Sequence, residues 1–149
     1  MPGMRERLAE DMKAAMRGKE ELRLATIRMI RAEILNKDKE HGKEAAEEDI
    51  LKVLQSMIKR REEAAGQFAK GGRPELAAKE RDELRIVQSY LPAQLGDEEL
   101  REAARAAVAE AGAATLKDMG KVMGVLSKRL AGRAAGARIS QAVKELLGG

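Results

Sequence analysis

The chain has 149 residues, with 44% hydrophobic, 36% charged and only 1% aromatic residues, and its 29 Lys and Arg against 25 Asp and Glu give a net charge of +4. This length accommodates one domain or two small ones, so we expect a modest hydrophobic core and no single large catalytic cleft. The sequence contains no cysteine, which excludes disulfides, thiolate catalysis and thiolate metal sites. Because Leu, Ile, Val, Met and Ala must fill the interior, the composition favours helices over strands.

Apolar residues spaced three and four apart predict helices along the first part of the chain. A short first helix ends at Gly18, and two longer ones follow over 20–41 and 47–70. Pro74 suits the first turn of a fourth helix, because its missing N–H costs nothing there, and this helix continues to the break at Pro92. Long helices joined by short turns favour antiparallel packing.

Three shorter helices are predicted for the rest of the chain. Asp97 is expected to cap the first of them, which ends at Gly112. Thr115 and Asp118, three residues apart, form a capping box for the second. A loop around Gly132 leads into the third.

The Pro and Gly residues of the stretch 91–96 act against a continuing helix, so the domain boundary is expected there. The sequence therefore predicts an all-α fold. It consists of an N-terminal helical domain of long antiparallel helices over 1–92, followed by a small C-terminal three-helix bundle over 93–149.

The location of the protein is predicted from what the sequence lacks. The first residues contain no apolar run of the secretory type, and nowhere do about 18 apolar residues follow one another as a membrane span requires. Since cysteine is absent too, we expect a cytoplasmic protein that does not contact a membrane.

The sequence offers few residues suited to catalysis. The only histidine, His41, lies in a polar stretch near a helix end and is expected to be solvated. The acidic run 47–49 lies at a helix start, where the helix dipole favours negative charge. No phosphate-binding loop, dinucleotide turn or metal-ligand spacing is present. We therefore predict no catalytic residues, no cofactor and no metal.

Basic residues concentrate near the C-terminus. From Gly112 to Gly149 there are seven basic residues against two acidic ones, while the rest of the chain is close to neutral. Such a run forms either a solvated helix face or a surface for a polyanion. With one Tyr and one Phe, stacking platforms for bases are excluded, so the binding alternative is contact with phosphates of a folded nucleic acid. The candidate contacts are Lys117, Lys121, Lys128, Arg129, Arg133 and Arg138.

Gly120 and Gly124 form a GxxxG pattern within this basic stretch. In a soluble helix we interpret the pattern as room for the close approach of a neighbouring helix.

Several runs of residues occur together in a characteristic order. They are Leu24-Ala25-Thr26-Ile27-Arg28-Met29-Ile30-Arg31-Ala32, then Arg73, Leu76, Ala77, Lys79-Glu80 and Glu83, then Tyr90-Leu91-Pro92, Asp118-Met119-Gly120-Lys121-Val122-Met123-Gly124 and Gly132-Arg133-Ala134. This pattern spans essentially the whole chain and resembles the YqeY proteins. The resemblance implies an N-terminal helical domain and a C-terminal three-helix domain, which agrees with the division above.

The C-terminal part is similar to the tail domain of GatB, a subunit of the bacterial tRNA amidotransferase, where the tail helps to grip tRNA. The resemblance implies binding, since this chain has no counterpart of the domains that carry the chemistry. Proteins of this kind can be labelled carbon–nitrogen ligases with glutamine as amide donor, and we interpret such a label as inherited from related enzymes.

One position departs from the family pattern. After the Gly-Arg-Ala run the family usually has Asp, and here the residue is Ala135. An Asp there would suit the N-cap of the last helix, so we expect either lower local stability or a cap supplied one turn later by Ser140.

The leading hypothesis is a non-catalytic accessory protein whose partners are tRNA or another structured RNA and an amidotransferase or other translation protein. The alternative is a helical protein-interaction adaptor that uses its N-terminal helices, with Arg28, Arg31, Arg60 and Arg61 among apolar stripes. A third hypothesis is that the chain itself catalyses glutamine-dependent amide transfer, but the sequence lacks the residues for acyl or phosphoryl chemistry.

Overall fold

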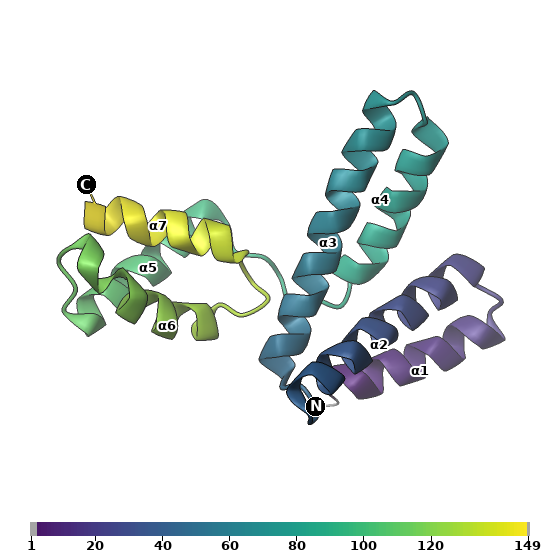
Figure 1. Cartoon of the computed structure of the whole chain (residues 1–149), viewed down its shortest axis with the longest axis horizontal. Coiled ribbons are helices and arrows are strands. Elements are labelled where there is room, and N and C mark those ends of the chain that lie inside the picture. Colours follow the sequence, from purple (N-terminus) through teal and green to yellow (C-terminus); the bar gives the residue numbers. More distant parts are fainter. Residues whose placement is uncertain (1–2, 149) are drawn as a thin grey trace. The chain divides into compact units, whose positions relative to one another are not determined.

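The computed structural model describes residues 3–148, and within this range every regular element is a helix (Figure 1). The predicted all-α fold class is confirmed. The chain divides into two compact units, Met1–Leu91 (unit 1) and Pro92–Gly149 (unit 2). None of the helices in the described range is both long and apolar enough to cross a membrane.

Unit 1 consists of two helical hairpins, in which α1 pairs with α2 and α3 with α4 (Figure 1). Its helices are α1 (Met4–Arg17), α2 (Glu21–His41), α3 (Glu47–Lys70) and α4 (Pro74–Gln88). The pairs are joined by contacts of α2 with both α3 and α4.

The fourth helix ends earlier than the sequence predicts. It stops at Gln88 and not at the break before Pro92, because the chain turns at Ser89. The hydroxyl of Ser89 donates to the carbonyl of Ile86 at 2.6 Å, and the turn directs the ring of Tyr90 into the core. The prediction for the end of this helix was therefore wrong by about one turn.

The core of unit 1 is built from aliphatic side chains and Met, with one aromatic ring. Full burial of each such side chain contributes about 1.5–3 kcal/mol. Its buried members are Met4, Leu8, Ile27, Ile30, Ile34, Ala45, Ile50, Leu54, Met57, Val87 and Tyr90.

A polar cluster holds α1 against the last turn of α2 and the connection that follows it. The guanidinium of Arg5 donates to both carboxylate oxygens of Asp38, at 2.9 and 2.7 Å. Asp38 Oδ1 also accepts the backbone N–H of Ala45 at 2.7 Å. The bond from Arg5 and that from Ala45 lower the pKa of Asp38, so the carboxylate stays charged and bound well into the acid range.

Tyr90 forms a second polar junction in unit 1. The residue is 2% exposed, and its hydroxyl donates to Asp11 of α1 at 2.5 Å. Arg7 stacks over the ring at 5.0 Å from its centroid, and Arg23 of α2 lies 3.8 Å from the same Asp11 oxygen. Burial and the neighbouring Asp11 raise the pKa of Tyr90 to about 12.

Unit 2 is a compact bundle of α5 (Asp97–Ala111), the 3₁₀ turn η1 (Leu116–Asp118), α6 (Met119–Arg129) and α7 (Gly136–Gly148). Its three α-helices all contact one another. Its buried residues are Leu95, Leu100, Ala104, Ala107, Val122, Leu126, Leu130, Ala134, Ile139, Ala142, Val143 and Leu147.

The structure separates a correct capping prediction from an incorrect one. The capping box of Thr115 and Asp118 is present, and Asp118 Oδ2 accepts the N–H groups of Ala114 and Thr115 at 2.9 and 3.2 Å. These bonds lower the pKa of Asp118. Asp97, by contrast, does not cap α5: Gly96 holds the N-cap position, and Asp97 is the first helical residue.

The raised pKa of Tyr90 predicts how unit 1 responds to alkali. Since the pKa lies above the value near 10 of an unfolded chain, the neutral phenol stabilises the fold fully below pH 10, and this contribution is lost between pH 10 and about 12. The chain has one Tyr and no Trp, so phenolate absorbance reports this group alone. We expect a midpoint near 12 in the native protein and near 10 in denaturant, with helical circular dichroism weakening over the same range.

Asp11→Asn provides the control. It removes the carboxylate but leaves the ring buried, so the midpoint should fall and stay above that of the denatured chain. A native midpoint equal to the denatured one would show that Tyr90 is not held as described.

Candidate nucleic-acid interface

Four hydrogen bonds join the segment before α5 and the first residue of α5 to the loop between α6 and α7 and to α7 itself. The N–H of Leu95 donates to the carbonyl of Arg133 at 2.8 Å, and the amide of Gln94 donates to the carbonyl of Gly132 at 2.6 Å. Arg138 returns from α7 and donates to the carbonyl of Leu95 at 3.1 Å and to Asp97 Oδ1 at 2.9 Å. We call this set the 94–97 clamp. It fixes the backbone on both sides of Arg133.

The clamp requires a glycine at the turn. Gly132 has a φ of 76°, a left-handed conformation that L side chains rarely adopt. Its neighbour Ala134 is buried in the core of unit 2, whereas Arg133 between them is exposed. The run Gly132-Arg133-Ala134 therefore places one guanidinium on the surface of unit 2.

Three of the six predicted phosphate contacts take part in the packing of unit 2. Lys121 donates to the carbonyl of Ala111 at 3.1 Å and so satisfies a free acceptor at the end of α5. Arg129 forms an ion pair with Glu110 of α5. Arg138 belongs to the 94–97 clamp. The charges of the two arginines are therefore partly compensated within the unit.

The other three predicted contacts are free. Lys117, Lys128 and Arg133 are exposed, and no group in the described part of the chain pairs with their side chains. Lys144 on α7 is in the same state, although it is not one of the six predicted contacts. These cations are available to an external anion without the loss of an internal bond.

The GxxxG pattern has a different environment from the one predicted. A Cβ placed on Gly120 or on Gly124 would meet no atom within 4 Å. No helix of the described chain packs against these glycines, so the expectation of a close helix neighbour is wrong. Both glycines are exposed, and Lys121 and Lys128 lie beside them on the face of α6 opposite to the buried Val122 and Leu126.

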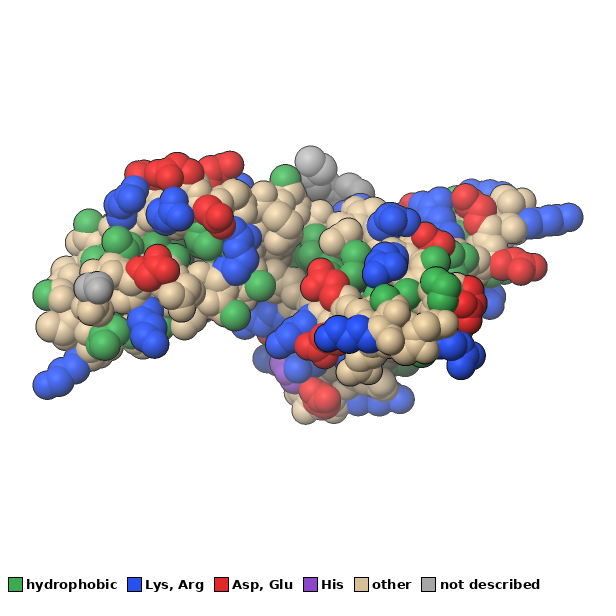
Figure 2. All heavy atoms as spheres, turned by 90° about the horizontal axis from the view of Figure 1, so that it is seen from above, with side chains coloured by type: hydrophobic (Ala, Val, Ile, Leu, Met, Phe, Trp, Pro, Cys, Tyr) green, Lys and Arg blue, Asp and Glu red, His purple; other side chains and the backbone are tan. Residues whose placement is uncertain are grey.

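The charges of unit 2 are distributed unevenly among its helices. From Pro92 onwards nine basic residues stand against seven acidic ones, and five of those seven lie on α5. The excess of positive charge is therefore found on α6, on α7 and in the loop before α7, while Lys117 and Asp118 balance each other on η1. Figure 2 shows that basic and acidic side chains also interleave over the face that it presents, so the excess is local.

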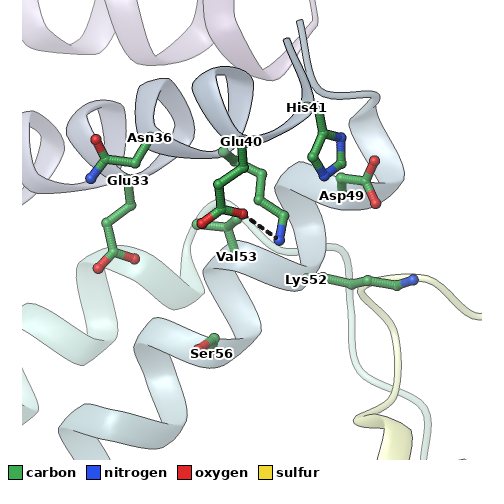
Figure 3. Close-up of a pocket in the computed structure, with 9 residues that line it drawn as sticks. Glu33, Asn36, Glu40, His41, Asp49, Lys52, Val53 and Ser56 are labelled. Atoms are coloured by element: carbon green, nitrogen blue, oxygen red, sulfur yellow. Dashed lines mark ion pairs between the residues drawn. The ribbon is translucent and has the colours of Figure 1, made fainter. Parts of the chain in front are cut away.

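A polar cleft of about 540 Å³ lies in unit 1 between α2 and α3. Figure 3 shows His41 and Asp49 at one end of this cleft and Ser56 towards the other. Its lysines have carboxylate partners, since Lys37 pairs with Glu40 and Lys52 with Glu48. His41 is exposed, as predicted, and nothing in the cleft joins the only histidine to the serine.

Metal binding receives no support from the described side chains, among which no group of three or more His, Asp and Glu residues could hold an ion.

The arginines named for the adaptor alternative fall into two pairs. Arg60 binds Glu33 through both of its oxygens at 2.6 Å, and the Nε of Arg61 lies 3.3 Å from Glu83 in a largely buried pair between α3 and α4. Arg28 is exposed without a partner in the described structure, and Arg31 contacts only the sulfur of Met12, at 2.9 Å.

Sequence comparison identifies the family of the chain. A family model described as Yqey-like protein matches residues 5–147. The chain belongs to the YqeY family. The match covers both units, and the three-residue run Gly132-Arg133-Ala134 at the 94–97 clamp lies within it.

Fungal proteins named "Altered inheritance of mitochondria protein 41, mitochondrial" are similar to this YqeY-family chain. That of Pyrenophora tritici-repentis is 31% identical over 146 residues, which cover 95% of this chain and 80% of the relative. The protein of Clavispora lusitaniae is 34% identical over 97 residues, which cover 64% of this chain and 56% of the relative. The protein of Saccharomyces cerevisiae is 32% identical over 85 residues, which cover 56% of this chain and 46% of the relative. The chain thus spans about half the length of the last two relatives.

These names overturn the cytoplasmic location expected from the sequence, because the relatives are mitochondrial proteins. The expectation rested on the lack of an apolar secretory segment, of a membrane span and of cysteine. Mitochondrial targeting segments are amphipathic and rich in Arg, so the lack of an apolar run never separated the two locations.

Ala135, where the family pattern usually has Asp, directly precedes α7. Its carbonyl accepts the N–H groups of Arg138 and Ile139 at 3.0 and 3.1 Å, as an N-cap residue does, but its side chain offers no acceptor. Ser140 lies inside α7 and cannot supply the cap one turn later, so that alternative is wrong.

Restoring the usual family residue should stabilise the bundle. Ala135→Asp adds an acceptor at the N-cap and a negative charge at the positive end of α7, and we expect a gain of about 1 kcal/mol in the free energy of unfolding. Urea unfolding followed by circular dichroism measures it. Ala137→Asp adds the same charge inside the first turn, so an equal gain from both variants would contradict the capping explanation.

Proposed function

We propose that unit 2 binds a structured RNA of the tRNA class through its phosphate backbone, with Lys117, Lys128 and Arg133 as the principal contacts. The observation that carries the proposal is the division among the cations of unit 2. Those three are exposed and unpaired in the described structure, whereas Lys121 and Arg138 are used in packing. Unpaired Lys and Arg gain the most from phosphates, because no internal ion pair has to break.

The shape of α6 supports contact with a backbone of phosphates. The exposed Gly120 and Gly124 present no side chain, so a partner can approach the helix closely between Lys121 and Lys128. In such an arrangement the glycines provide access and the cations provide the attraction.

The residue types argue for recognition of shape and phosphates. The two aromatic residues of the chain, Phe68 and Tyr90, both belong to unit 1, so unit 2 has no ring on which a base could stack. A surface of Lys and Arg alone recognises the spacing of phosphates in a folded RNA and is largely insensitive to its base sequence. The resemblance of the C-terminal sequence to the GatB tail domain, which no comparison tests, is the reason for choosing tRNA within this class.

We infer that the chain acts as an accessory protein. The proposed surface consists of Lys, Arg and Gly and contains no nucleophile beside a base. An amidotransferase or another translation protein would then supply the chemistry on an RNA that this chain helps to hold.

Titration of total tRNA with the full chain at several salt concentrations tests the proposal. Neutralising three phosphates should give a slope of log affinity against log salt of roughly −2 to −3. The triple variant Lys117→Glu, Lys128→Glu, Arg133→Glu should bind at least about tenfold more weakly at low salt and show a flatter slope.

The matched control changes Lys59, Lys79 and Arg81 of unit 1 to Glu. These residues are equally exposed and unpaired in the described structure, and the change in net charge is the same. The control should retain affinity within about threefold, the expected size of a long-range charge effect. Equal losses in both variants, or binding that does not depend on salt, would overturn the proposal.

A further inference from the structure

Unit 1 has a groove that its own packing leaves open. The groove has a volume of about 450 Å³ and lies between α1 and α2. Leu8 and Ile34 lie on its buried side. Leu35 beside them is 54% exposed, the highest exposed fraction among the large hydrophobic residues that the structure describes. The groove therefore offers an apolar strip that water covers in the isolated chain.

Cations without carboxylate partners flank this strip. Arg28 and Arg31 line the groove, and neither has an acidic partner in the described structure. Arg31 contacts the thioether sulfur of Met12, which is a weak acceptor. Arg5 and Asp38, at the other end of the lining, neutralise each other. The groove as a whole is thus apolar with a positive rim.

The position of these residues is not explained by the stability of unit 1. In the run Leu24–Ala32, Thr26 is buried and bonds to the carbonyl of Leu22, and Ile27 and Ile30 are fully buried in the core. Arg28, Arg31 and Ala32 lie on the opposite, exposed face of α2. Together with Leu35 they form a row of about two helical turns.

We propose that this groove docks an amphipathic helix of a partner protein, with one apolar face flanked by Asp and Glu. The apolar face would cover Leu35 and Ala32, and the carboxylates would pair with Arg28 and Arg31. Helices bind in this way when a hydrophobic groove offers anchor positions one turn apart. The positive rim selects acidic flanks over basic ones.

The same features argue against a nucleic acid at this place. Phosphates would pair with the arginines but would leave Leu35 and the apolar strip without a partner, and no aromatic ring lines the groove. A protein segment uses both the apolar strip and the charges. The docking surface is independent of the cations of unit 2, since its lining lies wholly in unit 1.

A titration of the isotope-labelled full chain with a synthetic peptide tests the proposal by NMR. The probe is an amphipathic helical peptide of about four turns with Leu on one face and Glu on its flanks, and the control peptide carries Lys in place of Glu. The acidic peptide should shift the amide signals around Leu35 and Arg31 in a saturable way, with a dissociation constant of about 10–100 μM. The basic peptide should bind at least about tenfold more weakly.

Two variants locate the site. Leu35→Glu places a charge in the apolar strip at an exposed helix position. It should lower the affinity for the acidic peptide at least about tenfold and leave the helical content unchanged. Leu146→Glu, at a residue of α7 that is 40% exposed, should have no effect on peptide binding. Affinity for tRNA should be the same in Leu35→Glu and in the unchanged chain.

Several results would overturn this inference. Absence of saturable shifts, equal binding of both peptides, or displacement of the acidic peptide by RNA would each show that the groove does not select an acidic helix. Self-association of the chain that Leu35→Glu abolishes would identify a second copy as the occupant and would equally contradict the proposal. Because the tRNA titration is read separately, failure here leaves the proposed function of unit 2 unaffected.

Discussion

The arrangement of unit 2 depends on the 94–97 clamp. Small bundles without aromatic residues have few large side chains to fix the helices, so polar contacts at the ends acquire more weight. Here the backbone of Leu95 and the side chain of Gln94 bind the turn before α7, while Arg138 binds back to the start of α5. The clamp closes the bundle and sets Arg133 on its surface. One set of contacts therefore provides both local order and an exposed cation.

The cations of unit 2 divide by what packing demands of them. Lys121 binds a backbone carbonyl that the end of α5 leaves without a donor. Arg129 and Arg138 each pair with a carboxylate of α5. Where no such acceptor exists, Lys117, Lys128 and Arg133 remain exposed. Unit 1 follows the same logic with Arg5 bound to Asp38 and Arg28 left free. Such a separation lets a fold keep its stability while its surface cations serve binding.

Local signals in the sequence predicted most of the fold, and non-local contacts were missed. The helices predicted to end at 41, at 70 and at Gly112 do so, and the capping box at Thr115 forms, because these effects act within one turn. The 94–97 clamp could not be predicted from the sequence, because it joins backbone and side-chain groups that are far apart in the chain. For the same reason the six candidate cations looked alike in the sequence, and only their packing partners distinguish them. Gly120 and Gly124 were misassigned because a small-residue pattern is the same whether a helix or solvent lies above it.

The central claim is that RNA contacts the cations that packing leaves free. Footprinting of lysine acetylation by mass spectrometry, with the full chain alone and saturated with tRNA, tests it most directly. We expect protection of Lys117 and Lys128 on unit 2. Lys59 and Lys79 of unit 1, which are also exposed, should be modified at unchanged rates. Protection confined to the lysines of unit 1, or uniform across both units, would contradict the account.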